Sequence, residues 1–248
     1  MAGMLHTTKG VVLRAVRYGE TSLVATVFTE AFGIQGYMVK GVRREGVRSP
    51  IRAAHFQPAS LLDMVVTHHD RSGLQHVREC RWAFLLTGLG RDIRKQSVAL
   101  FMMELLLKCL RQPYPQPELY AFTETSLLAL EAGGDGFAAN FPIHFSIRLA
   151  RLLGFHLEEG FRTDRPYLDL QEGVFLASPP DHLHAADVAS GALMDRFIRC
   201  TDAAQAQEIA MDRESRRRLL DHCLRFLTLH VPDFGSLRSL PVLQELMD

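Results

Sequence analysis

The sequence has 248 residues, 47% of them hydrophobic, and its 28 Lys and Arg residues balance 28 Asp and Glu residues. This length and composition predict a folded protein of one large or two small domains and exclude a disordered tail. The longest apolar run, residues 98–107, contains Glu104 and is shorter than the roughly 20 apolar residues that cross a bilayer, which excludes a membrane-spanning protein.

The amino-terminal residues and the cysteines indicate the compartment. Residues 1–10 lack the basic and then apolar plan of a signal peptide, so we expect a cytoplasmic protein. The four cysteines are far apart and form no CxxC pair, which predicts reduced thiols rather than a zinc or redox site; they are Cys80, Cys109, Cys200 and Cys223.

Five short β-strands are predicted in the first 81 residues. Each segment is short, several are rich in β-branched residues, and none has a helical period; the segments are 9–17, 21–29, 33–41, 60–68 and 73–81. Five such strands in about 75 residues predict a small closed or nearly closed barrel. A three-stranded sheet with two stray segments is the alternative.

Beyond Trp82 the hydrophobic period becomes helical. The predicted helices are 95–111, 117–131, 137–153, 185–199 and 212–231, and the first is apolar on both sides, which predicts a central position. Residues 155–184 interrupt this pattern with a small hairpin at 167–177. The sequence therefore predicts an α+β protein, with a β-barrel domain at 1–81 and an all-α domain at 82–248 that carries a small β-hairpin insertion.

The positive charge is concentrated near the amino terminus. Residues 1–60 contain eight Lys and Arg against three acidic residues, although the whole chain is neutral. The centre of this region is the segment KGVRREGVRS, residues 40–49, which lies between the third and fourth predicted strands. Such an asymmetry suggests an anionic partner for the basic half.

Loops between barrel strands bind single-stranded nucleic acid in barrels of the OB type, where cations neutralise phosphates and aromatic rings stack on bases. The nearby aromatic residues are Tyr18, Phe28, Phe32 and Tyr37, of which about half are needed for the core. A loop that is merely solvated is the alternative. The predicted DNA-binding residues are Lys40, Arg43, Arg44, Arg48, Arg52, Arg14, Arg17 and Tyr37.

The sequence contains few patterns that indicate catalysis. The sequence has no phosphate-binding loop, nucleophile elbow, HExxH or dinucleotide fingerprint. The clusters at 68–70 (His-His-Asp) and at His182 and His184 are interpreted as strand-end and loop residues rather than metal ligands. Arg216, Arg217 and Arg218 are interpreted as a helical face neutralised by acidic neighbours. We expect no enzyme, no cofactor and no metal.

Several segments, in order, resemble the bacterial recombination mediator family RecO. They are KGVVLRAVRYGETSLVATVFTEAFG, YMVKGVRR, FQPASLLDM, ELLLKCL, RLARLLGF and HVPDFGSLRSLPVLQEL, and they extend from about residue 9 to 247. The resemblance implies an OB-fold domain followed by a helical domain. The basic KG-x-R segment of the family falls on Lys40, Gly41 and Arg43.

The resemblance also implies a function. RecO proteins bind single- and double-stranded DNA, anneal complementary strands and, with RecR, help RecA to load onto DNA covered by the single-stranded DNA-binding protein SSB. They are not enzymes, and the resemblance implies a nucleoid-associated protein. The alternative is a scaffold whose barrel mainly binds RecR or SSB, with incidental DNA contact.

The helical half departs from the family in one respect and suggests a partner site. Many relatives carry a four-cysteine zinc motif after the segment matching LLGF, whereas residues 155–184 contain no cysteine. We therefore expect the hairpin at 167–177 to fill that place by ordinary packing. The acidic SSB tail needs an apolar pocket with a basic rim. Its predicted site is the helical stripe of His144, Arg148 and Arg151 beside Phe141 and Phe145.

Overall fold

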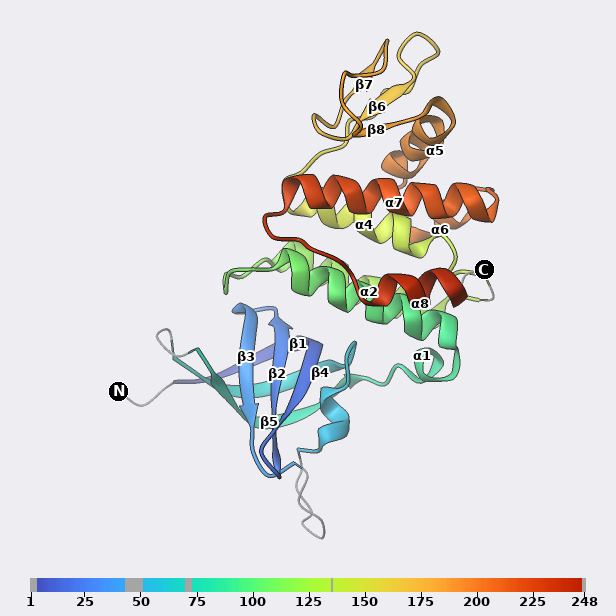
Figure 1. Cartoon of the computed structure of the whole chain (residues 1–248). Coiled ribbons are helices and arrows are strands. Elements are labelled where there is room, and N and C mark those ends of the chain that lie inside the picture. The colour runs from blue at the N-terminus through green and yellow to red at the C-terminus, as the bar shows by residue number, and fades with distance from the viewer. Residues whose placement is uncertain (1–3, 43–50, 70–72, 135, 247–248) are drawn as a thin grey trace. The chain divides into compact units, whose positions relative to one another are not determined.

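The computed structural model describes residues 4–42, 51–69, 73–134 and 136–246, which divide into two compact units. One unit comprises residues 1–92 and 110–131, and the other comprises 93–109 and 132–248. The first contains a five-stranded sheet and the second is mainly helical, so the fold is α+β (Figure 1). Residues 110–131, predicted to belong to the helical domain, group with the sheet instead.

All five predicted strands are present in the first unit. They are β1 (Met4–Tyr18), β2 (Ser22–Thr29), β3 (Gly33–Val39), β4 (Leu61–His68) and β5 (Gln75–Phe84). The strand order is β1-β2-β3-β5-β4, and β1 also pairs with β4, so every strand has two neighbours. The pairing of β3 with β5 is parallel and short, whereas the other pairings are antiparallel.

Alternating side chains build the core of this sheet. Along β2, β3 and β4 every second residue points inward, as β-branched and aromatic residues on a pleated strand do. The 3₁₀ helix η1 (Ala53–Phe56) adds the ring of Phe56. The buried cluster consists of Val12, Leu23, Ala25, Val27, Tyr37, Val39, Phe56, Leu62, Met64 and Val66.

Helices α1 (Thr87–Arg91) and α3 (Pro117–Ala132) complete the first unit. The carboxylate of Glu131 accepts hydrogen bonds of 2.7 Å from the backbone N–H groups of Gly88 and Leu89. The ring of Tyr120 packs edge to face on Phe28, with centroids 5.6 Å apart. These contacts explain why residues 110–131 group with the sheet despite their helical pattern.

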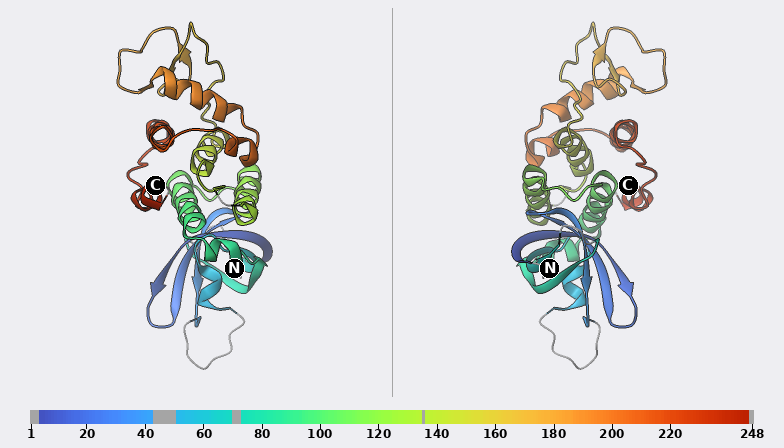
Figure 2. Two further views of the ribbon diagram at one scale, coloured as in Figure 1. Left: turned by 90° about the vertical axis from the view of Figure 1, so that its right-hand side faces the viewer. Right: turned by 90° about the vertical axis from the view of Figure 1, so that its left-hand side faces the viewer.

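The second unit consists mainly of α-helices. They are α2 (Ile93–Cys109), α4 (Phe141–Leu152), α5 (Val188–Arg199), α6 (Ala203–Gln207), α7 (Arg213–His230) and α8 (Ser239–Leu246). Helices α2, α4, α7 and α8 run side by side, and Figure 2 shows them nearly end-on. Helix α2 is buried on several sides, and its Glu104 accepts hydrogen bonds from the backbone N–H groups of Arg238 and Ser239, which fixes the start of α8.

The insertion in the helical unit is a three-stranded sheet. The predicted hairpin is present as β6 (Tyr167–Asp169) and β7 (Phe175–Leu176), and β8 (Ala185–Ala186) pairs with the other edge of β6. Residues 185–186 were expected to open a helix, but α5 begins at Val188. The reason is the cap at Asp187, whose Oδ1 accepts a hydrogen bond of 2.8 Å from the Ser190 N–H.

Candidate nucleic-acid interface

The strand register brings two basic segments to one end of the five-stranded sheet. Arg17 of β1 pairs with Leu23 of β2, and Leu23 pairs with Val39 of β3. Lys40 follows Val39, so it lies two strands away from Arg17, at a backbone separation of about 10 Å. The exposed Tyr18 lies at the same end, since it pairs with Ser22 at the start of β2.

A groove opens where β3 ends and β5 begins. The parallel pairing is limited to Tyr37 with Gln75 and Met38 with His76, after which β5 continues without β3 beside it. The groove is lined by Met38, Val39, Lys40, Ile51, His76, Val77 and Arg78. The Nε of Arg78 donates a hydrogen bond of 2.7 Å to Thr67 Oγ1, which orients its guanidinium group at the groove.

Most of the predicted cations that the structure describes share the end of the sheet. Arg14, Arg17, Lys40 and Arg52 are exposed, and none of their side chains forms an ion pair with another described residue. Arg14 pairs with Thr26, three residues inward from Arg17, so it lies apart from the others. Arg43, Arg44 and Arg48 lie outside the described residues. We call Arg17, Lys40, Arg52 and Arg78 the basic end.

The prediction that Tyr37 contacts DNA is wrong. Its side chain is 0% exposed in the core of the sheet, so its ring is closed to a nucleobase. Burial also raises the pKa of its hydroxyl. Of the other nearby aromatic residues, Phe28 is 0% exposed and Phe32 stacks on His68, with centroids 4.0 Å apart. Tyr18 alone of these four is strongly exposed, at 60%.

Sequence reasoning missed His76, Arg78 and Trp82. The charge count that located the basic region ended at residue 60, although the fifth predicted strand carries Arg78 and Arg81. Continued to residue 81, the count adds three basic and three acidic residues, so net charge alone does not single out Arg78. The position of Trp82 beside η1 depends on tertiary contacts, for which the sequence has no local signal.

The structure also differs from the predicted SSB-tail site on α4, because most of that stripe is buried. Phe141, His144 and Phe145 are 2%, 3% and 0% exposed, so they belong to the helical core. Burial, assisted by the nearby Arg148 charge, lowers the pKa of His144 to about 4. The ring is therefore neutral at pH 7 and cannot supply a basic rim. On this stripe only Arg151 is fully exposed.

An apolar pocket with arginines lies between α4, α7 and α8 instead. Pro142, Ile143, Leu220 and Leu243 form its apolar wall, and Arg213, Arg216 and Arg217 also line it. Arg216 is fixed, since its Nε donates a hydrogen bond of 3.0 Å to Asn140 Oδ1, and burial lowers its pKa. The sequence predicts a helical face neutralised by acidic neighbours here, because it does not show that α4 and α8 meet α7.

The histidine clusters have structural surroundings. His182 Nε2 lies 3.3 Å from Asp169 Oδ2, and His182 Nδ1 accepts a hydrogen bond from the His184 backbone N–H. The ring of His68 rests on Phe32, and Asp70 lies outside the described residues. Across the part of the chain that the structure describes, no three His, Cys, Asp or Glu side chains gather as metal ligands do.

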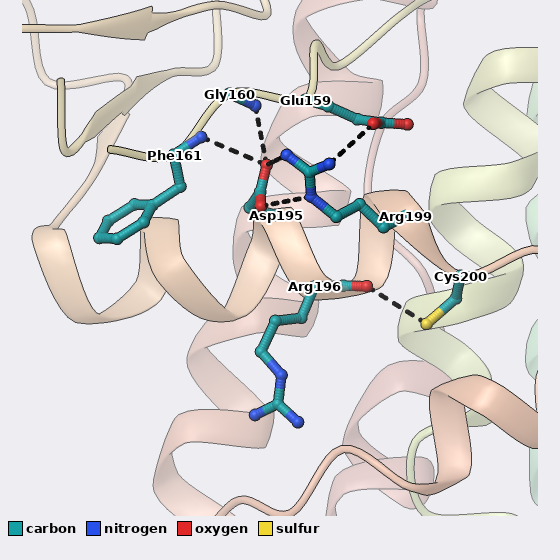
Figure 3. Close-up of polar contacts among 7 residues, drawn as sticks. All are labelled: Glu159, Gly160, Phe161, Asp195, Arg196, Arg199 and Cys200. Atoms are coloured by element: carbon teal, nitrogen blue, oxygen red, sulfur yellow. Dashed lines mark hydrogen bonds and ion pairs between the residues drawn. The ribbon is translucent and has the colours of Figure 1, made fainter. Parts of the chain in front are cut away.

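A carboxylate fastens the insertion to α5 (Figure 3). Asp195 Oδ1 accepts hydrogen bonds from the backbone N–H groups of Gly160, at 2.8 Å, and Phe161, at 3.3 Å. Arg199 donates to both oxygens of Asp195, at 2.7 and 3.2 Å, and pairs with Glu159 at 3.1 Å. The insertion is thus held by a polar network as well as by packing.

The fold and the basic end define a two-unit protein with a candidate polyanion site. The family model described as "Recombination protein O N terminal" matches residues 1–85, and that described as "Recombination protein O C terminal" matches residues 90–241. The chain therefore belongs to the RecO family of DNA repair and recombination proteins.

Individual relatives agree with this assignment. The chain is 29% identical to "DNA repair protein RecO" of Bacteroides fragilis, over 99% of this chain and 100% of the relative. It is 28% identical to the protein of the same name from Christiangramia forsetii, over 98% and 99% respectively. Within the described ranges, no helix is long and apolar enough to cross a membrane.

Proposed function

We propose that this chain is a recombination mediator that binds single- and double-stranded DNA, anneals complementary strands and, with RecR, helps RecA to load onto SSB-coated single strands. The observation that supports this most is the basic end of the five-stranded sheet, of which Lys40 and Arg78 line a groove. We also assign the sheet to the OB class of barrels, on the basis of its strand order and the pairing of β1 with β4.

The chemistry of the basic end suits a phosphate backbone. Lys40, Arg17 and Arg52 are exposed and lack described carboxylate partners, so binding a polyanion requires no ion pair to break. Neutralised phosphates release counterions, which gives an affinity that depends on salt and not on base sequence. Such binding accepts single strands and duplexes alike and leaves base pairing to the DNA, as annealing requires.

The SSB tail has a better site in the pocket between α4, α7 and α8 than on the predicted stripe. An acidic tail that ends in apolar residues needs an apolar floor and basic groups beside it. Ile143, Leu220 and Leu243 supply the floor, and Arg213 and Arg217 supply exposed cations. Contacts with RecR, and an indirect role toward RecA, follow from family membership in this proposal.

The experiment that tests the mediator function is strand annealing and SSB displacement by the triple variant Arg43→Glu, Arg44→Glu and Arg48→Glu. We expect both activities to be lost, because three charges in the segment that follows Lys40 in the sequence are reversed. A variant with Arg162→Glu and Arg165→Glu, which reverses exposed cations of the insertion, serves as the control and retains both. Wild-type annealing by the triple variant would place the DNA site elsewhere.

A scaffold that grips RecR or another protein is the second candidate. It is favoured by exposed apolar side chains of the same unit, including Met4 at 70% and Leu5 at 65% at the start of β1. In that case the cations contribute little, and DNA binding changes little with salt.

A further inference from the structure

The only tryptophan of the chain lies near the end of β5 and remains accessible. Trp82 pairs with Leu62 of β4, and 37% of its surface is exposed. Large aromatic residues are usually among the most buried in a domain, and tryptophan supplies the largest stacking surface of any side chain. An accessible indole in the unit that carries the basic end therefore requires an explanation.

One side of the indole is supported by η1. The His55 ring centroid lies 4.1 Å from that of Trp82, with an angle of 45° between the planes. His55 is itself buried, and its Nδ1 accepts a hydrogen bond of 3.0 Å from the Arg52 backbone N–H. Burial lowers the pKa of His55, so its ring is uncharged at neutral pH. Trp82 is thus braced from one side by a fixed, neutral ring.

Trp82 is connected to the basic end through β5 and through residues 51–55. His76 and Arg78 line the groove with Lys40 at the start of this strand, and Trp82 follows His76 by about 20 Å along the strand. Residues 51–55 lie beside β5, since Ile51 lines the groove and His55 contacts Trp82. Arg52 lies between these two positions in the chain, which places one cation of the basic end next to the residues that support the indole.

We propose that Trp82 is a stacking platform for an unpaired nucleobase of a strand whose phosphates lie on the basic end. This inference rests on the proposed function, since it requires DNA at that end. A base within a duplex is already stacked between its neighbours and is closed to the indole. Trp82 therefore selects single-stranded over double-stranded DNA, a preference that phosphate contacts alone do not give.

The sole tryptophan makes the inference directly measurable. A labelled oligo-dT is titrated into the full-length protein while label anisotropy and tryptophan fluorescence are both recorded. We expect the fluorescence to be quenched over the same concentration range in which the anisotropy rises. An oligonucleotide of abasic sugar phosphates should raise the anisotropy at higher concentration without that quenching.

The outcomes separate this inference from the proposed function. A rise in anisotropy with unchanged tryptophan fluorescence overturns the stacking role and leaves DNA binding intact. Equal quenching by the abasic strand overturns it as well, because no base is then needed. If the anisotropy does not change at low salt, both the proposed function and this inference are wrong.

Variants supply a second measurement. Trp82→Leu keeps an apolar side chain but removes the aromatic face, and we expect about 5- to 100-fold weaker binding of oligo-dT with unchanged binding of a duplex. Trp82→Phe should stay close to wild type. Tyr114→Leu is the matched control, since Tyr114 is 68% exposed but lies beside Gly33, at the other end of β3. Equal losses for single strands and duplexes in Trp82→Leu contradict the proposal.

Discussion

The cations of the basic end and two arginines of the helical unit, Arg199 and Arg216, are similar residue types in different surroundings. At the basic end, Arg17, Lys40 and Arg52 are exposed without a described carboxylate partner. In the helical unit, Arg199 is held by Asp195 and Glu159, and Arg216 is hydrogen-bonded to Asn140.

This difference decides which cations are available to a ligand. A guanidinium group that already has carboxylate partners must give them up before it binds phosphate, whereas an exposed and solvated cation gives up only counterions and water. A basic residue count therefore locates a candidate region, and the neighbours of each cation decide its role.

The largest expected effect is the loss of folding stability in acid caused by the buried His144 of the helical unit. His144 has a folded-state pKa of about 4, below its ordinary value of 6.5, because of burial and the nearby Arg148 charge. The unfolded chain takes up a proton first as the pH falls, so stability is full above pH 6.5 and is lost progressively down to about pH 4.

The decrease in the free energy of unfolding attributable to His144 is roughly 3 kcal/mol at pH 4. Denaturant unfolding across this pH range checks it, with His144→Gln as the reference that lacks the titrating group. We expect the free energy of unfolding of the variant to fall less steeply with acid. Parallel curves for the two proteins would show that His144 is accessible after all.

The second prediction concerns the affinity of the basic end for single-stranded DNA. We expect Lys40→Glu with Arg78→Glu to weaken single-stranded DNA binding by about a hundredfold at low salt, because two phosphate contacts are replaced by repulsion. Fluorescence anisotropy measures it. The double variant Arg162→Glu and Arg165→Glu carries the same change in net charge on the insertion and should bind normally. Similar losses in both would mean that only net charge matters.

The third prediction concerns the ion pair of Arg199 with Asp195 in the helical unit. Burial alone would raise the pKa of Asp195, but hydrogen bonds from Arg199 and from the Gly160 and Phe161 N–H groups lower it. Asp195→Asn should reduce the free energy of unfolding by roughly 1–3 kcal/mol at pH 7, because the partly buried donors lose their charged acceptor.

The contribution of Asp195 also has a sign with pH. Since its folded pKa is depressed, the stabilisation is present above the ordinary carboxyl pKa and is lost as the pH falls through the folded value. The gap between wild type and Asp195→Asn should therefore narrow in strong acid. Asp164→Asn, in an exposed ion pair with Arg162, is the control and should cost little at any pH. An equal cost in the two variants contradicts the role of Asp195.

The smallest effect concerns the proposed SSB site. Arg217→Glu should weaken binding of an SSB-tail peptide about fivefold, as expected for one exposed charge at the rim of a pocket. Arg151→Glu lies on the predicted stripe instead and should bind the peptide as wild type does. A loss confined to Arg151→Glu would restore the stripe and remove the pocket between α4, α7 and α8.

The elements were largely predictable because their signals are local. Short segments without a helical period, several of them rich in β-branched residues, located all five strands, and the long helices 93–109 and 213–230 followed from their apolar period. Short helices such as α1 and α6 were missed, since five residues are too few to show a period. Helix α4 starts at Phe141 rather than 137, and the preceding Asn140 side chain instead bonds the carbonyls of Ala206 and Ile209.

The candidate site was predictable only in part. The position of Lys40 between two strands follows from the sequence, but the inward direction of Tyr37 depends on which face of β3 closes on the core. The partial burial of the stripe on α4 likewise depends on the packing of α5, α6 and α7 around it. Long-range packing carries these facts, and no periodicity within one segment records it.

The most direct test of the central claim is the salt dependence of single-stranded DNA binding by the wild-type protein. A site with four or five phosphate contacts should show a logarithmic slope of about −3 in affinity against salt concentration. Reversing Lys40 and Arg78 should make that slope shallower by about one unit or more. A nearly flat response in the wild-type protein would contradict the DNA-binding account and favour the scaffold.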